Sequence, residues 1–528
     1  MVVVRARHAG RTRTAEILAG ATLRDGLDGT GLRVRTGCKG NGSCGLCQVR
    51  ILAGEVSAPT VEERLQLGAA ELQAGLRLAC QTRPKGDVEL EVVHRAADSV
   101  WRAIAPAALT SPVRPTVPPA GPSGAIAAHA ALDVGTTNLC LALWSGDAAH
   151  RLATRRGPNP QARFGADVVS RLEAARDHSA AEALALAVQQ GVAEAFDDVA
   201  LRDGIRLAQL CSIVAVGNAA MLNLLRATHG GLLDPASWPG TASSAPPPLH
   251  WALADGREAT VQIVSPLGGF VGSDLLAAVL AAGLVDRACP ALLLDFGTNT
   301  EIALWDGRAL WVTSAAGGPA FEASGMSCAV PAEPGAVYRV WLAGGELGFD
   351  VIDGAEPTGI CGSGLVDWLA CLARGGAISP RGRFVPGGAA AAPVLVAGGR
   401  ELVLTARDVD VFQRAKAAIG AGARLLAQRA GIAFAELRRV VTTGLFGRAL
   451  DVGNAQAVGL LPAAPAALFE TYDNLALCGC ELLLGAEQGA RALAELRQRA
   501  RLVNLAQCVE FEELFVDGLF LRPMEGAS

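Results

Sequence analysis

The start of the chain shows the short alternating pattern of apolar and polar positions that is typical of a small sheet. Residues 2–5 (Val-Val-Val-Arg) are β-rich and lead to a turn at residues 9–11, which predicts an opening hairpin. Residues 48–51 and 88–93 are further expected strands, and residues 69–78 predict a short helix. We therefore expect residues 1–97 to form an α+β domain of the β-grasp type.

Proline interrupts this pattern in residues 98–127. Six prolines lie between residues 106 and 122, and proline favours extended backbone over helix. We expect a semi-rigid linker there. It would either let the first domain move between two docking positions or act as an inert spacer.

Strand and helix patterns alternate through residues 128–528, which is typical of an α/β fold. Leu-Asp-Val-Gly-Thr-Thr-Asn at residues 132–138 returns, 162 residues later, as Leu-Asp-Phe-Gly-Thr-Asn-Thr at residues 294–300. Each copy ends one apolar strand and enters another, so we expect two related lobes, at about 128–288 and 289–528. The expected strands are 213–216, 292–295, 301–304, 402–405 and 440–443, and the expected helices are 180–199, 273–282, 409–429 and 473–485.

Composition limits the class of protein. With 528 residues, 51% of them hydrophobic and 18% charged, the chain can bury several large cores. The net charge is −5 and there is no block of lysine or arginine, so we expect neither nucleic acid nor membrane as a partner. The longest apolar run, at 275–285, is too short to span a bilayer, and no signal-peptide pattern opens the chain, so we expect a cytoplasmic protein.

Four of the thirteen cysteines form a ligand pattern: Cys38, Cys44 and Cys47 on one glycine-rich loop, and Cys80 from a distant segment. This arrangement is typical of a [2Fe–2S] cluster, although the first gap is one residue longer than in plant-type ferredoxins. Glycines at 37, 40, 42 and 45 let backbone N–H groups face the sulfurs. The alternative is a zinc site, which usually shows two close cysteine pairs where this chain has one.

The two repeated turns carry the chemistry of phosphate binding. A strand that ends in aspartate and continues as glycine and threonine offers turn N–H groups and hydroxyls to phosphate oxygens. The aspartate would act through Mg²⁺ and its waters. The alternative is a common hairpin turn, but a turn repeated in two lobes favours nucleotide. The candidate residues are Asp133, Gly135, Thr136, Thr137, Asp295, Gly297, Thr298 and Asn299.

A second glycine-rich segment, residues 357–367, runs into an expected helix. The helix N-terminus near Gly362 is either a site for anionic oxygens or a tight loop before a core helix. Cys361 lies in this loop, but no Cys-His motif accompanies it, so we interpret it as a packed thiol.

These motifs together resemble the reductive activators of corrinoid proteins, which join an amino-terminal [2Fe–2S] ferredoxin domain to a two-lobed ATPase domain of the ASKHA class. Besides the cysteine run, the matching stretches are 132–137, 215–221, 269–274, 294–301, 318–322, 357–367, 414–419 and 451–462.

The resemblance implies an ATP-dependent, one-electron reduction of a corrinoid protein from Co(II) to Co(I), with the [2Fe–2S] cluster as donor. It implies ATP and Mg²⁺ as cofactors, a corrinoid protein of a methyltransferase system and an upstream electron donor as partners, and a homodimer as a candidate assembly. Asp133, Asp274 and Asp295 would be the catalytic carboxylates, and Gly444 would belong to the turn that meets adenosine. In that turn Leu445 stands where the family has a second glycine.

Three other functions compete with this hypothesis. The main one is a ferredoxin-tethered nucleotide sensor or assembly factor that binds a redox partner without driving its reduction. An NADH-fed iron–sulfur reductase lacks support because no G-x-G-x-x-G fingerprint follows a strand. A small-molecule kinase has no use for a one-electron carrier.

Overall fold

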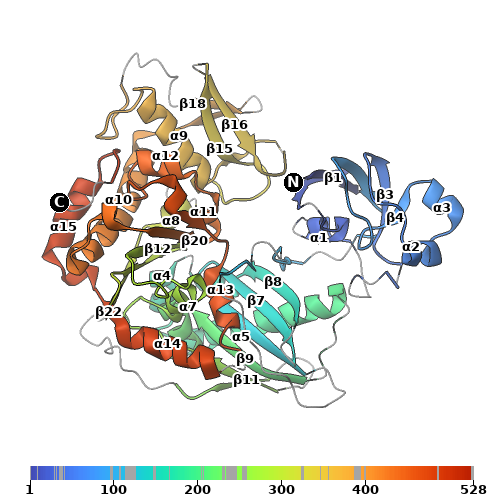
Figure 1. The fold of residues 1–528 in the computed structure, drawn as a ribbon, viewed down its shortest axis with the longest axis horizontal. Helices are drawn as coiled ribbons and strands as arrows, with labels where there is room; N and C mark the ends of the chain where they lie inside the picture. Colours follow the sequence, from blue (N-terminus) through green and yellow to red (C-terminus); the bar gives the residue numbers. More distant parts are fainter. Residues whose placement is uncertain are drawn as a thin grey trace.

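In the computed structural model of the chain, a small amino-terminal domain lies beside two larger lobes (Figure 1). None of the helices in the described residues is long and apolar enough to cross a membrane. The structure describes residues 2–8, 10–18, 20–28, 30, 32–34, 40, 42–43, 45–95, 99–105, 109–112, 127–146, 150–165, 167–203, 205, 207, 209–228, 232, 246–252, 258–322, 326–344, 346–354, 356–385, 394–397, 400–484 and 487–524.

The amino-terminal domain is a five-stranded sheet in the order β2-β1-β5-β3-β4. The expected opening hairpin is confirmed. The helix expected at 69–78 is only half right, because Gly75, with a φ of 79°, ends it and residues 76–78 form a strand. The elements are β1 (Val2–His8), β2 (Arg11–Ile17), α1 (Leu23–Asp28), β3 (Gln48–Ala53), α2 (Val61–Gln66), α3 (Ala69–Gln73), β4 (Leu76–Leu78) and β5 (Val88–Val92).

Lobe one is built on a six-stranded sheet in the order β10-β11-β9-β6-β7-β8, with helices packed on its faces. Its strands are β6 (Ala127–Val134), β7 (Asn138–Ser145), β8 (Arg151–Pro158), β9 (Gln209–Gly217), β10 (Leu249–Ala252) and β11 (Glu258–Ile263). Its helices are η2 (Pro160–Phe164), α4 (Val168–Ala174), α5 (His178–Asp203), α6 (Ala219–Leu225) and α7 (Ser273–Ala282), so the helices expected at 180–199 and 273–282 are confirmed.

Lobe two contains a sheet in the order β21-β20-β12-β13-β14-β22. Its strands are β12 (Ala291–Phe296), β13 (Thr300–Trp305), β14 (Leu310–Ala315), β20 (Arg439–Thr443), β21 (Phe469–Thr471) and β22 (Ala500–Leu502). Two smaller sheets hold β15 (Ala336–Ala343), β16 (Glu346–Val351) and β17 (Gly359–Ile360), and β18 (Val394–Ala397) and β19 (Arg400–Val403).

The helix expected at 409–429 is confirmed within α10, whereas the one expected at 473–485 is shorter, because α13 begins after Asn474 and ends at Glu481. The strand expected at 402–405 ends at Val403, because the Thr405 hydroxyl accepts the Asp408 N–H and begins α10. The helices are α8 (Gly318–Phe321), α9 (Gly362–Arg374), α10 (Ala406–Ala430), α11 (Leu445–Ala449), α12 (Val452–Ala457), α13 (Leu475–Glu481), α14 (Glu487–Arg499) and α15 (Val509–Gly518), with short turns η5 (Ile352–Gly354), η6 (Phe434–Glu436), η7 (Ala466–Leu468) and η8 (Leu505–Gln507).

The two large sheets share one topology at their centres. In each, the strand before the glycine turn (β6 or β12) is parallel to one neighbour (β9 or β20) and antiparallel to the strand after the turn (β7 or β13). The expected pair of related α/β lobes is therefore confirmed.

The segment expected to be a linker is partly packed on lobe one. Arg102 and Arg156 exchange two backbone hydrogen bonds of 2.7 and 2.8 Å at the edge of β8. Trp101 is buried in the lobe-one core, and a Cβ added to Gly157 would lie 2.6 Å from its indole ring. Ile104 and Leu109 are buried as well. Residues 113–126 lie outside the described residues.

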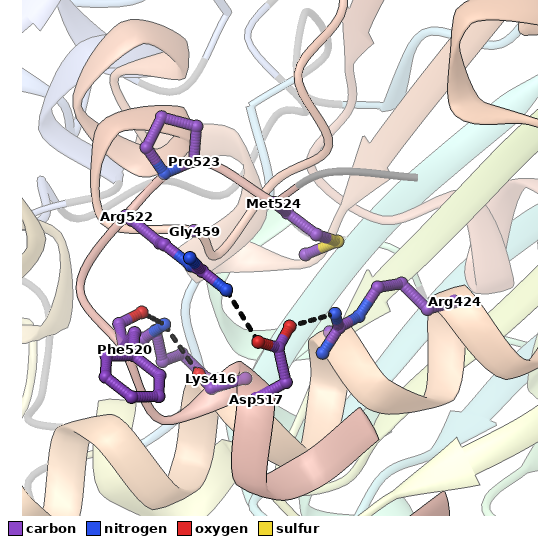
Figure 2. Close-up of a pocket in the computed structure, with 10 residues that line it drawn as sticks. Lys416, Arg424, Gly459, Asp517, Phe520, Arg522, Pro523 and Met524 are labelled. Carbon is purple, nitrogen blue, oxygen red and sulfur yellow. Dashed lines mark hydrogen bonds and ion pairs between the residues drawn. The ribbon is translucent and has the colours of Figure 1, made fainter. Parts of the chain in front are cut away.

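The carboxyl-terminal segment is fastened to α10 around a small cavity of about 30 Å³ (Figure 2). The Lys416 ammonium donates to the carbonyls of Gly518 (2.7 Å) and Phe520 (2.5 Å), and Arg424 and Arg522 both pair with Asp517. Burial lowers the pKa of Lys416 to about 7. Lys416, from one of the stretches of resemblance, therefore has a structural role.

Candidate functional site

The two repeated turns line one cavity of about 560 Å³ between the lobes. The eight candidate residues of these turns all line this cavity, and so do Asp274, Gly362 and Gly444. The residues that line the cavity are Asp133, Gly135, Thr136, Thr137, Asn138, Cys140, Arg156, Asn218, Asp274, Asp295, Phe296, Gly297, Thr298, Asn299, Glu301, Phe321, Glu322, Pro331, Ala332, Glu333, Cys361, Gly362, Ser363, Gly444, Leu445, Phe446, Ala449, Asp473, Asn474 and Ala476.

The lobe-one turn is held rigidly between β6 and β7. The Gly135 N–H donates to the Asn138 carbonyl (3.0 Å), and a Cβ at Gly135 would lie 2.8 Å from that oxygen. The Asn159 amide donates to the Gly135 carbonyl (2.7 Å), and Arg171 donates to the Thr136 carbonyl (2.8 Å). The Gly135 and Thr136 carbonyls therefore accept hydrogen bonds from within lobe one, and the Thr137 hydroxyl faces the cavity.

The lobe-two turn repeats this geometry, with the Gly297 N–H donating to the Asn299 carbonyl (3.1 Å). The hydroxyl oxygens of Thr137 and Thr298 lie only 2.8 Å apart. Both hydroxyls donate to the Glu322 carboxylate, at 3.0–3.2 Å. The two lobes therefore meet directly at the groups that were expected to bind phosphate.

Four carboxylates stand behind the turns. Burial, and then repulsion between neighbours, raises the pKa of Asp274 to about 7 and that of Asp295 to about 8. Burial raises the pKa of Asp133 to about 6, and the Asn474 amide, which donates to this carboxylate at 3.0 Å, limits the rise. Glu301 is buried, and burial followed by repulsion from Asp274 and Asp295 raises its pKa well above the ordinary range.

Four carboxylates buried this close together repel one another when ionised, and a bound cation would relieve that repulsion. Within the described residues, no three His, Cys, Asp or Glu side chains lie close enough to hold a metal ion alone. A magnesium ion usually takes one or two carboxylates and completes its shell with waters and substrate phosphates. The donor set fits an ion that arrives with a phosphate ligand.

Lobe two contributes an ion pair and an amide from the start of α13. Asp473 pairs with Arg156 of lobe one (3.1 Å) and with Arg448 (3.0 Å). Asn474 begins α13, its side chain accepting the Leu477 N–H (2.7 Å) while its amide reaches Asp133. These contacts tie the start of α13 to β6 and β8 of lobe one.

The glycine-rich segment at 357–367 places the N-terminus of α9 on the cavity wall, at Gly362 and Ser363. A Cβ at Gly362 would lie 2.5 Å from the Phe321 carbonyl, so glycine is needed there for packing. Cys361 is buried, with its sulfur 3.5 Å from the Ser363 hydroxyl.

Gly444 has a φ of 89°, and a Cβ there would lie 2.2 Å from the Phe296 carbonyl. Both observations require glycine at the end of β20. Leu445 is half-exposed on the cavity wall, while Phe446 stacks on Phe321 with ring centres 4.5 Å apart. A side chain therefore lies on this wall where glycine would leave open space.

The amino-terminal domain places two of the four expected cluster ligands together. The Cys47 and Cys80 sulfurs are 3.3 Å apart, both residues are buried and no disulfide joins them. Their hydrogen bond is the largest cause that lowers the pKa of Cys80, to about 6, which favours the thiolate that iron binds. Cys38 and Cys44 lie outside the described residues.

The loop around these sulfurs is built from glycine. Gly40, Gly42 and Gly45 have φ values of 88°, 85° and 66°, which other residues rarely adopt. The Gln81 amide donates to the Gly40 carbonyl (2.7 Å) and lies 3.7 Å from the Cys80 sulfur. Paired buried sulfurs under a left-handed glycine loop fit a thiolate-bound iron–sulfur cluster.

Sequence reasoning did not select Glu322, Glu301, Arg156, Asp473 or Asn474 as site residues. Glu301 and Glu322 lie inside stretches of resemblance, so the motif itself was a usable signal. Arg156, on the plain strand β8, carried no signal of this kind.

Comparisons with known proteins assign the three parts of the chain. Residues 6–85 match the 2Fe-2S iron-sulfur cluster binding domain, residues 129–287 match the RACo middle region, and residues 290–527 match the C-terminal domain of RACo, the ASKHA domain. The corrinoid activation enzyme RamQ of Eubacterium limosum is 31% identical over 411 residues, which is 73% of this chain and 69% of the relative.

Two further relatives agree. The [Co(II) methylated amine-specific corrinoid protein] reductase of Methanosarcina barkeri is 28% identical over 219 residues, 36% of this chain and 38% of the relative. The solved structure of a reductive activator for a corrinoid, iron-sulfur protein covers 99% of both chains at 23% identity with a TM-score of 0.65, which shows a shared fold. This chain therefore belongs to the family of reductive activators of corrinoid proteins, in which a [2Fe–2S] domain is joined to an ASKHA domain.

Proposed function

We propose that this chain uses ATP to drive the one-electron reduction of a corrinoid protein from Co(II) to Co(I). The observation that carries the proposal is that the two repeated glycine turns meet in one cleft, through Thr137, Thr298 and Glu322. The same chain carries a domain in which two buried cysteine sulfurs lie side by side. The names of the relatives supply the class of substrate.

In this proposal each turn holds one side of the triphosphate. Thr136 and Thr137 donate from lobe one, and Thr298 and Asn299 donate from lobe two, with Gly135 and Gly297 allowing close approach of the backbone. Asp133, Asp274 and Asp295 hold Mg²⁺, which neutralises phosphate charge when bound. The N-terminus of α9 at Gly362 faces anionic oxygens, and Gly444 lies on the wall for the nucleoside.

Cys38, Cys44, Cys47 and Cys80 would hold the cluster, which supplies one electron at a time when bound. A tenfold shift in a one-electron equilibrium corresponds to ~59 mV, or ~1.4 kcal/mol. Coupling between sites is typically ~1–3 kcal/mol, which moves a potential by only ~40–130 mV. We therefore expect selective binding of the Co(II) form of the partner to contribute part of the driving force.

The test is anaerobic spectroscopy of the purified chain with reductant, ATP and a candidate corrinoid protein, following the appearance of Co(I). Cys44→Ala should lose the cluster and Co(I) formation while ATP still binds. Cys289→Ala, a half-buried cysteine of lobe two, is the matched control and should behave like the unaltered chain. Normal reactivation by Cys44→Ala would show that the proposed electron path is wrong.

The same experiment separates reduction from the sensor or assembly alternative. A chain that only senses nucleotide would bind ATP and the corrinoid protein without ATP-dependent formation of Co(I). The methyltransferase system, the upstream donor, a homodimer and a cytoplasmic location stay predictions from the sequence.

A further inference from the structure

A buried network of ion pairs joins the amino-terminal domain to lobe one. It forms where α1, on the side of the domain nearest the lobes, meets the end of α5 (Figure 1). The seven side chains are at most about one-tenth exposed. They are Arg24, Asp28 and Arg33 of the amino-terminal domain and Arg155, Asp198, Arg202 and Asp203 of lobe one.

Asp203, the last residue of α5, is the centre of the network. Its carboxylate accepts hydrogen bonds of 2.5 Å from Arg24 across the junction and from Arg155 and Arg202 on its own side. One turn earlier, Asp198 receives both guanidinium N–H groups of Arg33, at 2.9 and 3.0 Å. Two carboxylates at the end of one helix thus hold the amino-terminal domain in place.

Arg24 also lies against the cluster loop. A Cβ added to Gly40 would come within 2.5 Å of the Arg24 Nη1 atom and 3.7 Å of the Cys80 Cβ atom. The backbone N–H of Arg24 donates to the Ala79 carbonyl (3.0 Å), directly before that cysteine. The guanidinium therefore lies between the cluster loop and Asp203.

Charge at this position acts on the redox equilibrium. The reduced form of a thiolate-bound cluster carries one more negative charge than the oxidised form, so a nearby cation favours reduction and raises the potential. Asp203 compensates the cation Arg24 when the domain is docked. Docking also excludes water from the junction, which acts in the same direction as Asp203 and lowers the potential.

Helix α5 connects this point to the nucleotide cleft. The Gln161 amide donates to the Leu184 carbonyl in the first half of α5 (3.0 Å), and Gly191 lies beside Pro160. Asn159, the residue before η2, donates to the Gly135 carbonyl of the first phosphate turn. At 1.5 Å per residue, the part of α5 from Leu184 to Asp203 spans ~29 Å between these regions.

We propose that Asp203 is a positioning residue that holds the amino-terminal domain docked on lobe one and, through Arg24, makes the docked cluster a stronger electron donor. The proposal rests on the assignment of the cysteine loop to a cluster. It needs neither ATP nor a corrinoid protein for its test, so its failure is distinct from failure of the proposed activity.

The experiment is a redox titration of the full, cluster-loaded chain, with the reduced cluster followed by electron paramagnetic resonance. Asp203→Asn should raise the midpoint potential by the equivalent of at least a tenfold change in the one-electron equilibrium, about 59 mV. In an Arg24→Gln background, the same substitution should raise the potential much less, because the cation that lies against the cluster loop is gone and only Arg155 and Arg202, on the lobe-one side, lose their partner.

Two further measurements test whether a change in potential arises from the junction between Arg24 and Asp203. Amide hydrogen exchange in the last turn of α5 should speed up in both Asp203→Asn and Arg24→Gln, since each substitution opens the junction. Glu173→Gln, which removes an exposed carboxylate elsewhere on lobe one, should change neither exchange nor potential. An unchanged potential in Asp203→Asn, or an equal rise in the Arg24→Gln background, would overturn the proposal, even with faster exchange.

Discussion

At the scale of single residues, Glu322 occupies the position that, in the proposed function, a terminal phosphate would take between the two threonine hydroxyls. Its carboxylate accepts from Thr137 and Thr298 at 3.0–3.2 Å. A bound triphosphate would take over these donors and leave the carboxylate beside the phosphate, within reach of an attacking water. Glu322 is therefore our candidate for the general base.

Glu322→Gln keeps the size of the side chain and removes its basicity. We expect the rate of ATP hydrolysis to fall by ~10²–10⁴-fold, the usual contribution of a general base, while ATP binds at least as tightly because a negative charge has been removed. Steady-state turnover and equilibrium nucleotide binding check this, with Glu333→Gln on the same cavity wall as control. Unchanged turnover would rule out the role of Glu322 as base.

Asp295 gives a prediction for pH. Its pKa of about 8 in the folded chain lies above the ordinary value of 3.8, so the folded state binds this proton more tightly than the unfolded state. Stability from this group therefore falls as pH rises between those values, by up to about 1.4 kcal/mol per pH unit. Asp133 and Asp274, also raised, act in the same direction.

We expect the Tm of the nucleotide-free, metal-free protein to drop between pH 6 and pH 8, and to drop less in Asp295→Asn. Differential scanning calorimetry at several pH values measures both. Taking the difference between the two proteins removes the opposite contribution of Lys416, whose lowered pKa makes the folded state more stable as pH rises. Parallel pH curves would contradict the raised pKa of Asp295.

At the scale of elements, the lobes are joined by the crossing of α7 and α13. A Cβ added to Gly479 would lie 1.9 Å from the Ala277 carbonyl oxygen, so the two helices touch through backbone. Asn474, at the start of the same helix, reaches Asp133. The spacing of the lobes at the cleft floor therefore depends on one glycine.

Gly479→Ala should force the helices apart at a cost of ~1–3 kcal/mol, which a lower Tm and weaker nucleotide binding would report. Gly453→Ala in α12 is the control, because the nearest atom to its added Cβ lies at an ordinary 3.4 Å. That substitution should be neutral or stabilising by up to ~1 kcal/mol. Equal effects of the two substitutions would contradict the role of the crossing.

The elements also show what the sequence could predict. Helix 273–282 was predicted to the residue, since an apolar run begins after Gly272 and ends at Gly283, whose φ is 56°. The repeated turns predicted the paired lobes, because their residues are local in sequence. Asp473 and Asn474 could not be placed in the cleft, because their position depends on how α13 packs against α7 and β6.

At the scale of the whole molecule, Trp101 fixes the start of the proline-rich segment to lobe one. Composition predicted a semi-rigid linker there, but the Trp101 indole is 3% exposed over Gly157, and the Trp101 carbonyl accepts from Arg33 of the amino-terminal domain (2.7 Å). Composition does not reveal such an anchor, because the space for the ring is supplied by a glycine 56 residues later.

Trp101→Ala should release this segment, at a cost of ~3–5 kcal/mol of local packing, and give the amino-terminal domain more freedom. Small-angle scattering should then show a larger radius of gyration at unchanged iron content. Trp341→Ala, a substitution of a half-exposed indole on β15, should leave the radius as it was. An unchanged radius in Trp101→Ala would show that the ion pairs alone hold the domain.

The anchored tryptophan also limits how far an electron can be carried. Only residues 96–98 separate Arg95 from Ser99, so those two Cα atoms can be at most ~14 Å apart while the indole stays in its socket. With so short a connection, the amino-terminal domain cannot move far between separate docking sites. The upstream donor and the corrinoid protein would then have to bind the same small surface of the amino-terminal domain one after the other. An excess of either should therefore inhibit binding of the other.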